Sequence, residues 1–88
     1  MLKVKRFTAK WCGPCRQLAP VFTQIEEEMK DEPIEFQTID VDEDRALAIE
    51  ANVSSVPTIL IEKDGQEVYR TKGALPKAVI IKNIKDQL

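Results

Sequence analysis

The stretch Trp11-Cys12-Gly13-Pro14-Cys15 contains both cysteines of this 88-residue chain. Two thiols separated by two residues can close into a small disulfide ring and reopen, and C-x-x-C beside a βαβ pattern is typical of redox proteins. Pro14 stiffens the ring, and Gly13 leaves the approach to the first sulfur uncrowded. The motif follows a predicted strand and begins a predicted helix, whose unpaired N–H groups lower the pKa of a nearby thiol. The sequence therefore predicts a redox site here.

The segments on either side of the motif predict alternating strands and helices. Residues 2–8 are predicted as a strand anchored by Val4 and Phe7. From Pro14 to Met29, apolar residues recur at three- and four-residue spacing, which predicts an amphipathic helix with a proline inside it. The rest of the chain predicts, in order, a strand over 34–41, a short helix over 43–51 capped by Asp42, a strand over 58–61, a strand over 67–72 and a helix over 75–88.

Two of these helices are expected to bury particular apolar side chains. The helix over 43–51 is predicted to turn Ala46, Leu47 and Ile49 inward. The helix over 75–88 is predicted to bury a stripe at helical spacing, formed by Leu75, Val79, Ile80, Ile84 and Leu88. Such stripes would allow the two helices to pack against a sheet.

The order of elements predicts one α/β domain over residues 1–88, arranged βαβ, α, ββ, α. The right-handed crossover rule places the first helix over one sheet face and makes the first two strands parallel. Turn residues at 63–66 predict a hairpin, whose strands join the sheet in antiparallel orientation. We therefore expect a four-stranded mixed sheet with helices on both faces.

Composition and charge exclude several classes of function. A net charge of -2 disfavours non-specific binding of nucleic acid, and no apolar run approaches the roughly 20 residues of a membrane span. The basic N-terminus is not followed by an apolar signal core, so a reducing, cytoplasmic compartment is expected. The chain has no histidine, which removes histidine-dependent hydrolases, and two cysteines supply half of a closed zinc site. No metal and no cofactor are expected.

Further fragments share an order and spacing with a known family. Beside the pentapeptide, they are Pro20 within the first helix, Asp42 after the second strand, Val56-Pro57-Thr58, the Asp64-Gly65 turn and Gly73-Ala74. With these fragments the chain resembles thioredoxin essentially from end to end, in a short form that lacks the family's first strand and helix. The resemblance implies a thioredoxin-like fold and a thiol–disulfide oxidoreductase that reduces disulfides in partner proteins.

The resemblance also implies roles for individual residues. Cys12 would be the nucleophile and Cys15 the resolving thiol. Pro57 is similar to the family's cis-proline, which would leave the backbone of Val56 free to pair with an extended substrate segment. Substrate proteins would dock on Trp11, Gly13, Pro14, Val56, Pro57 and Gly73. The expected electron donor is a thioredoxin reductase, and the expected oligomeric state is a monomer.

The chain departs from the family's pattern near this site. Arg6 occupies the position of the usual buried aspartate that helps to move the proton of the second cysteine, and Thr38 replaces the lysine that often partners it. An arginine near the sulfurs would favour thiolates, so we expect a more acidic Cys15 or a less reducing couple. In the alternative, Arg6 extends to solvent at the sheet edge. Asp40 and Asp42 are further candidate modulators of the thiol pKa.

Two other functions fit parts of the sequence. The short length also suits a glutaredoxin-like reductase of glutathione mixed disulfides, but Lys72-Gly73-Ala74-Leu75 lacks the Gly-Gly pair and acidic residue with which glutaredoxins hold glutathione. A thioredoxin-like accessory subunit, whose surface rather than its sulfurs serves the partner, is the second alternative. The intact redox motif favours the oxidoreductase over both.

Overall fold

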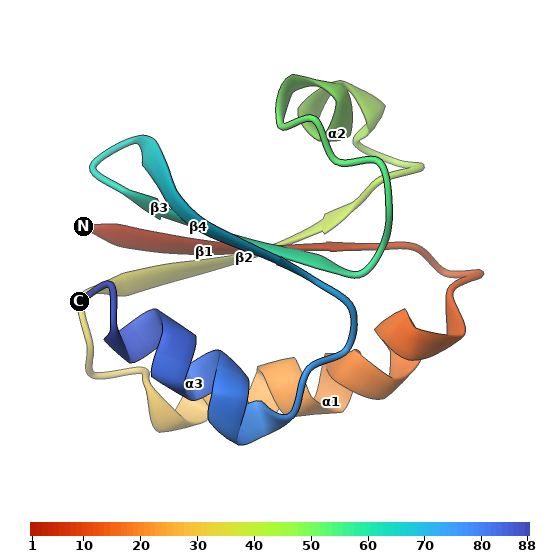
Figure 1. Ribbon diagram of the computed structural model, residues 1–88. Helices are drawn as coiled ribbons and strands as arrows, with labels where there is room; N and C mark the ends of the chain where they lie inside the picture. The colour runs from red at the N-terminus through yellow and green to blue at the C-terminus, as the bar shows by residue number, and fades with distance from the viewer.

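The structure is a computed structural model that describes residues 1–88, and its elements follow the predicted order (Figure 1). Each lies within three residues of its predicted bounds. The elements are β1 (Leu2–Thr8), α1 (Gly13–Glu28), β2 (Ile34–Asp40), α2 (Arg45–Glu50), β3 (Thr58–Lys63), β4 (Gln66–Lys72) and α3 (Lys77–Lys85). None of the three helices combines the length and the apolarity that crossing a membrane would require.

The four strands form one mixed sheet in the order β2-β1-β3-β4. β1 pairs with β2 in parallel and with β3 in antiparallel orientation, and β3 and β4 form an antiparallel hairpin. Helices α1 and α3 cover one face of this sheet, and α2 lies over the other (Figure 1). The predicted α/β fold, with a four-stranded mixed sheet between helices, is confirmed.

The main core lies between the sheet and the layer of α1 and α3. Leu18, Phe22 and Ile25 recur along α1 at three- and four-residue spacing and are at most 1% exposed. They pack with apolar residues from β1, β3 and α3, among them Val4, Ile61 and Ile84. A smaller cluster of Phe7, Ile39 and Leu60 lies on the other sheet face, toward α2.

The short helix α2 differs from its prediction. It begins at Arg45, and its N-cap residue is Asp44, which makes no capping bond through its side chain. Asp42 is therefore not the helix cap. The reason is a turn at the end of β2, where the Asp40 carboxylate accepts the N–H groups of Asp42 and Glu43 and keeps them out of the helix.

The burial predicted for the later helices is also partly wrong. In α2, only Ala48 is buried, whereas Ala46, Leu47 and Ile49 are exposed. A helix of six residues presents too few positions to the sheet to bury a full stripe. In α3, Ile80 and Ile84 are buried, and Leu75 packs against the same core. The remaining two residues of the predicted stripe, Val79 and Leu88, are exposed. Val79 lies on the side of α3 that faces away from the core, and Leu88 follows the end of the helix at Lys85.

Arg6 is a charged residue within the main core. It is 8% exposed, so the alternative in which it extends to solvent is wrong. Its guanidinium carbon lies 5.2 Å from the centroid of the Phe22 ring, and its Nη2 donates a 3.4 Å hydrogen bond to Thr38 Oγ1. Its Nε is buried without a hydrogen-bond partner. Burial lowers the pKa of the Arg6 guanidinium, and the charge of Glu26 opposes this shift.

We expect Arg6→Met to raise the free energy of unfolding by about 1 kcal/mol, because desolvation of this weakly paired cation outweighs what its contacts return. Urea denaturation at neutral pH, followed by circular dichroism, measures the change. Ile25→Ala is the control for ordinary core packing and is expected to lower stability by about 2–5 kcal/mol. Lower stability of Arg6→Met than of the parent would show that the cation stabilises the core.

Candidate active site

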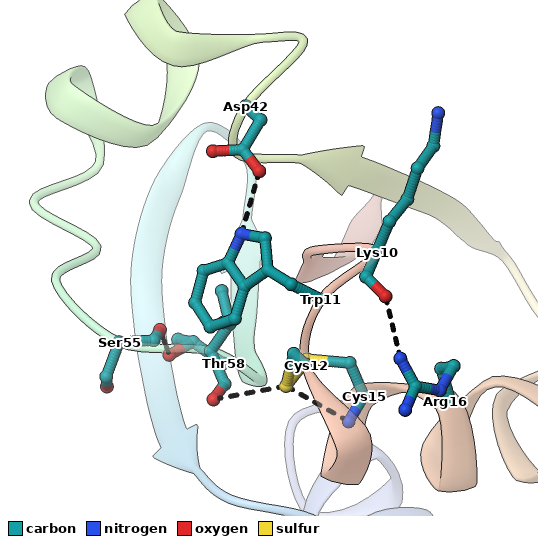
Figure 2. Close-up of a disulfide and its surroundings, with 9 residues drawn as sticks. Lys10, Trp11, Cys12, Cys15, Arg16, Asp42, Ser55 and Thr58 are labelled. Carbon is teal, nitrogen blue, oxygen red and sulfur yellow. Dashed lines mark hydrogen bonds between the residues drawn. A yellow bond between two sulfur atoms is a disulfide. The ribbon is translucent and has the colours of Figure 1, made fainter.

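The two cysteines lie at the junction between β1 and α1. β1 ends at Thr8, and the chain turns through residues 9–11, with the Cys12 N–H donating to the Ala9 carbonyl oxygen at 3.2 Å. Cys12 is the N-cap residue of α1, and Cys15 lies in its first turn. Their Cα atoms are 5.2 Å apart, and their sulfurs form a disulfide (Figure 2). The pair can therefore take up two electrons when this bond opens and release them when it closes.

The helix N-terminus distinguishes the two sulfurs. The backbone N–H of Cys15 donates a 3.2 Å hydrogen bond to Cys12 Sγ (Figure 2). This N–H is one of the donors that a helix leaves unpaired at its start, where the helix dipole also favours negative charge. Both residues are largely buried, but Cys12 is 5% exposed and Cys15 1%. After reduction, the same N–H would stabilise an anionic Cys12 sulfur.

The loop between α2 and β3 approaches the disulfide from the opposite side. Cys12 Sγ lies 3.7 Å from the carbonyl oxygen of Val56, and the Val56–Pro57 peptide bond is cis. The Thr58 hydroxyl donates to the Ser55 carbonyl oxygen at 2.8 Å (Figure 2). The Gly73 N–H donates to the Pro57 carbonyl oxygen at 2.9 Å. These bonds attach the loop to the strands that follow it.

Trp11 forms an exposed wall beside the disulfide. Its indole N–H donates a 2.9 Å hydrogen bond to Asp42 Oδ2 (Figure 2). Despite this bond, Trp11 is 68% exposed to solvent. Asp42 follows the end of β2. Because β1 and β2 are parallel, both strands end at the same edge of the sheet, which brings Asp42 close to Trp11. A cavity of about 110 Å³ lies between Trp11 and the loop, lined by Trp11, Val41, Val53, Ser54, Ser55 and Val56.

Glycines occupy two positions around the site for different reasons. Gly73 has φ +93°, in the left-handed region that favours glycine. Gly13 has an ordinary backbone conformation, and a Cβ added to it would contact nothing within 4 Å. Any need for glycine at position 13 would therefore come from an incoming partner and not from packing within this chain.

The candidate pKa modulators are not bonded to either sulfur. The Arg6 guanidinium contacts Thr38 and Phe22, the Asp40 carboxylate holds the turn after β2, and the Asp42 carboxylate holds Trp11. Any effect of these groups on the cysteines would therefore have to act through space or through an intermediate residue. No group of three or more His, Cys, Asp or Glu side chains is arranged to hold a metal ion.

Sequence reasoning missed several residues that shape the site. The cavity walls Val41, Val53, Ser54 and Ser55 were not predicted as binding residues. Arg16 Nη1 donates to the Lys10 carbonyl oxygen at 2.8 Å (Figure 2), and the Lys10 ammonium pairs with Glu43 at 3.0 Å, a hydrogen bond that raises the pKa of Lys10. These contacts arise from the tertiary fold, which brings Glu43 beside Lys10.

Comparison with known proteins gives the family. The family model described as thioredoxin matches residues 2–86. The chain is 44% identical over 78 residues to thioredoxin-2 of Saccharomyces cerevisiae, covering 89% of this chain and 73% of that protein. It is 42% identical over 74 residues to thioredoxin of Bacillus subtilis, covering 84% and 70%. The X-ray structure of Fasciola hepatica thioredoxin superimposes with a TM-score of 0.91 at 36% identity, covering 99% of this chain and 81% of that one.

These similarities agree with the chemistry of the site. A Cys-x-x-Cys pair at disulfide distance, in a chain with these relatives, supports the activity of a thiol–disulfide oxidoreductase that reduces protein disulfides. The matched region includes all seven elements of the fold and both cysteines. The chain belongs to the thioredoxin family.

Proposed function

We propose that Cys12 attacks the disulfides of partner proteins and that Cys15 resolves the resulting mixed disulfide. The Cys12 thiolate forms a bond to one sulfur of the partner's disulfide, whose S–S bond breaks and releases the other sulfur as a thiolate. Cys15, once deprotonated, then attacks Cys12 Sγ and displaces the partner's remaining sulfur. Two electrons pass to the partner, its two thiolates take up protons, and the Cys12–Cys15 disulfide remains.

The observation that carries this assignment is the hydrogen bond from the Cys15 N–H to Cys12 Sγ at the start of α1. It supports Cys12 as the thiolate because the donor and the helix dipole both favour negative charge on that sulfur. The greater exposure of Cys12 supports it as the sulfur that a partner reaches first. Cys15 is almost fully buried, so it is suited to attack the neighbouring Cys12 sulfur of the mixed disulfide and not the disulfide of a free partner.

Partner proteins dock, in this proposal, on the surface formed by Trp11, Gly13, Pro14, Val56, Pro57 and Gly73. Support comes from the carbonyl oxygen of Val56, which lies 3.7 Å from Cys12 Sγ and would place a paired substrate strand beside the reactive sulfur. The exposed indole of Trp11 and the adjacent cavity offer an apolar contact for a side chain of that strand. The hydrogen bond to Asp42 fixes the orientation of the indole.

The remaining parts of the proposal concern the working state of the protein. Residues 1–88 act as one domain and as a monomer, in a reducing, cytoplasmic compartment where a lone Cys-x-x-Cys pair is typical of redox chemistry. Electrons return to the disulfide from a thioredoxin reductase, as membership of the family suggests. Arg6 modulates the cysteines through its buried positive charge.

The order of the two thiols is tested by trapping. We expect Cys15→Ser to accumulate a mixed disulfide with insulin, because nothing remains to resolve the bond on Cys12, whereas Cys12→Ser accumulates none. Non-reducing gels and intact mass spectrometry measure the adduct, and the double variant is the control. The parent protein is expected to reduce insulin with NADPH and a thioredoxin reductase but not with glutathione and its reductase. An adduct on Cys12→Ser alone would reverse the assignment.

The role of Arg6 is tested by the redox potential of Arg6→Met. A positive charge favours thiolates and hence the reduced form, so its removal is expected to make the couple more reducing. Equilibration of the parent and the variant with the same dithiothreitol redox buffer, followed by alkylation and mass spectrometry, gives both potentials. Unchanged potentials and unchanged thiol titrations would remove Arg6 from the site.

A further inference from the structure

A bulge in β4 brings two charged side chains to the same face of the sheet. Ile61 pairs with Tyr69, but the next residue of β3, Glu62, pairs with Glu67, so that Val68 is an extra residue in β4. Because side chains alternate along a strand, this extra residue moves Glu67 to the face on which Arg70 already lies. This is the face that α2 covers (Figure 1).

Arg70 uses its guanidinium to join β4 to the end of α2. Its Nε and Nη2 donate to the two carboxylate oxygens of Glu67 at 2.9 and 2.8 Å. Its Nη1 donates to the carbonyl oxygen of Asn52 at 3.1 Å, and Nη2 also donates to that of Ala51 at 2.6 Å. Both carbonyls lie at the C-terminus of α2, where helices leave acceptors unpaired and where a positive charge is favourable. The hydrogen bond from Arg70 also lowers the pKa of Glu67.

Apolar packing at this end of α2 is limited to partly buried side chains, since Ala51 and Val53 pack against the cluster of Phe7, Ile39 and Leu60. The helix has six residues and buries only Ala48. A cavity of about 290 Å³ lies between it and the sheet, with Glu67 and Arg70 in its wall. A helix of this length is not stable by itself and depends on its tertiary contacts. The Arg70 guanidinium therefore adds hydrogen bonds to the backbone of residues 51 and 52, where apolar packing is slight.

The segment that follows α2 leads directly to the reactive sulfur. Asn52 has φ +57° and ends the helix, and the Val53 N–H donates back to the Ala48 carbonyl oxygen at 2.9 Å. Residues 53–56 then form the wall of the small cavity beside Trp11 and carry the Val56 carbonyl oxygen to 3.7 Å from Cys12 Sγ. Movement at residues 51 and 52 would thus move the backbone that faces Cys12.

We infer that Arg70, oriented by Glu67, is a positioning residue that holds the 53–56 loop in place for partner proteins. The inference rests on the proposed docking of partners along Val56, and it assigns to Arg70 no contact with the substrate or the sulfurs. Two consequences separate this role from general stabilisation. Loss of Arg70 should weaken reactions that use the docking surface, and it should leave the intrinsic reactivity of Cys12 unchanged.

The test compares Arg70→Met with the control variant Arg45→Met. Arg45 is an exposed residue of α2 whose guanidinium makes no hydrogen bond and no ion pair. For Arg70→Met we expect kcat/KM for insulin reduction to fall about threefold to tenfold, mainly through KM, because the docking backbone is displaced. Alkylation of reduced Cys12 by iodoacetamide should change by less than about twofold, since the N-terminus of α1 is untouched. Arg45→Met should match the parent in both assays.

Hydrogen exchange supplies a readout that does not depend on activity. In oxidised Arg70→Met, the Val53 amide should exchange faster, whereas amides of β1 should exchange as in the parent. Glu67→Gln retains the arginine and should show a smaller effect of the same kind, which covers the case in which Arg70→Met does not fold. Unchanged exchange at Val53, or an equal loss of insulin reduction and alkylation, would overturn the inference. A parent protein that fails to reduce insulin would contradict the proposed function instead, while exchange still decides whether Arg70 holds the loop.

Discussion

A single hydrogen bond, from the backbone N–H of Cys15 to Cys12 Sγ, determines how the site can work. It exists because β1 ends four residues before Cys12 and α1 begins just after it, so that the N-terminus of the helix faces its own capping sulfur. Packing along α1 fixes this arrangement, since Leu18, Phe22 and Ile25 belong to the core against the sheet and Cys15 packs with Ala9 and Cys12. The chemistry of the pair is thus set by the same packing that stabilises the fold.

Three loops meet at this end of the sheet, and polar bonds join them in addition to the apolar cluster of Ala9, Cys12 and Cys15, against which Val41 and Val56 pack. The loop before α1 is bonded to the one after β2 through Trp11 and Asp42. The Asp40 carboxylate shapes the loop after β2 by accepting two backbone N–H groups. The loop before β3 is fixed at one end by Thr58 and, as we infer, at the other by Arg70. A partner would therefore meet a surface that is formed in advance, which lowers the entropic cost of docking.

Most of the fold could be predicted from the sequence, because periodicity and turn residues act locally. The parallel pairing of β1 and β2 followed from the crossover rule, and the disulfide between Cys12 and Cys15 followed from the spacing of the two cysteines. The exposure of Leu47 and Ile49 could not be predicted, since apolar residues in a short helix do not reveal how little of it meets the sheet. The Trp11–Asp42 bond and the contacts of Arg70 join residues far apart in the chain, and their geometry depends on the complete fold.

The account depends most directly on the state of the Cys12 sulfur in the reduced protein. The decisive measurement is the rate of iodoacetamide alkylation at each cysteine as a function of pH, resolved by mass spectrometry of the labelled peptides. We expect Cys12 to react first, with a midpoint clearly below the value of about 8.5 for free cysteine. If neither sulfur reacted faster than free cysteine at neutral pH, or if Cys15 reacted first, the proposed role of the helix N-terminus would be contradicted.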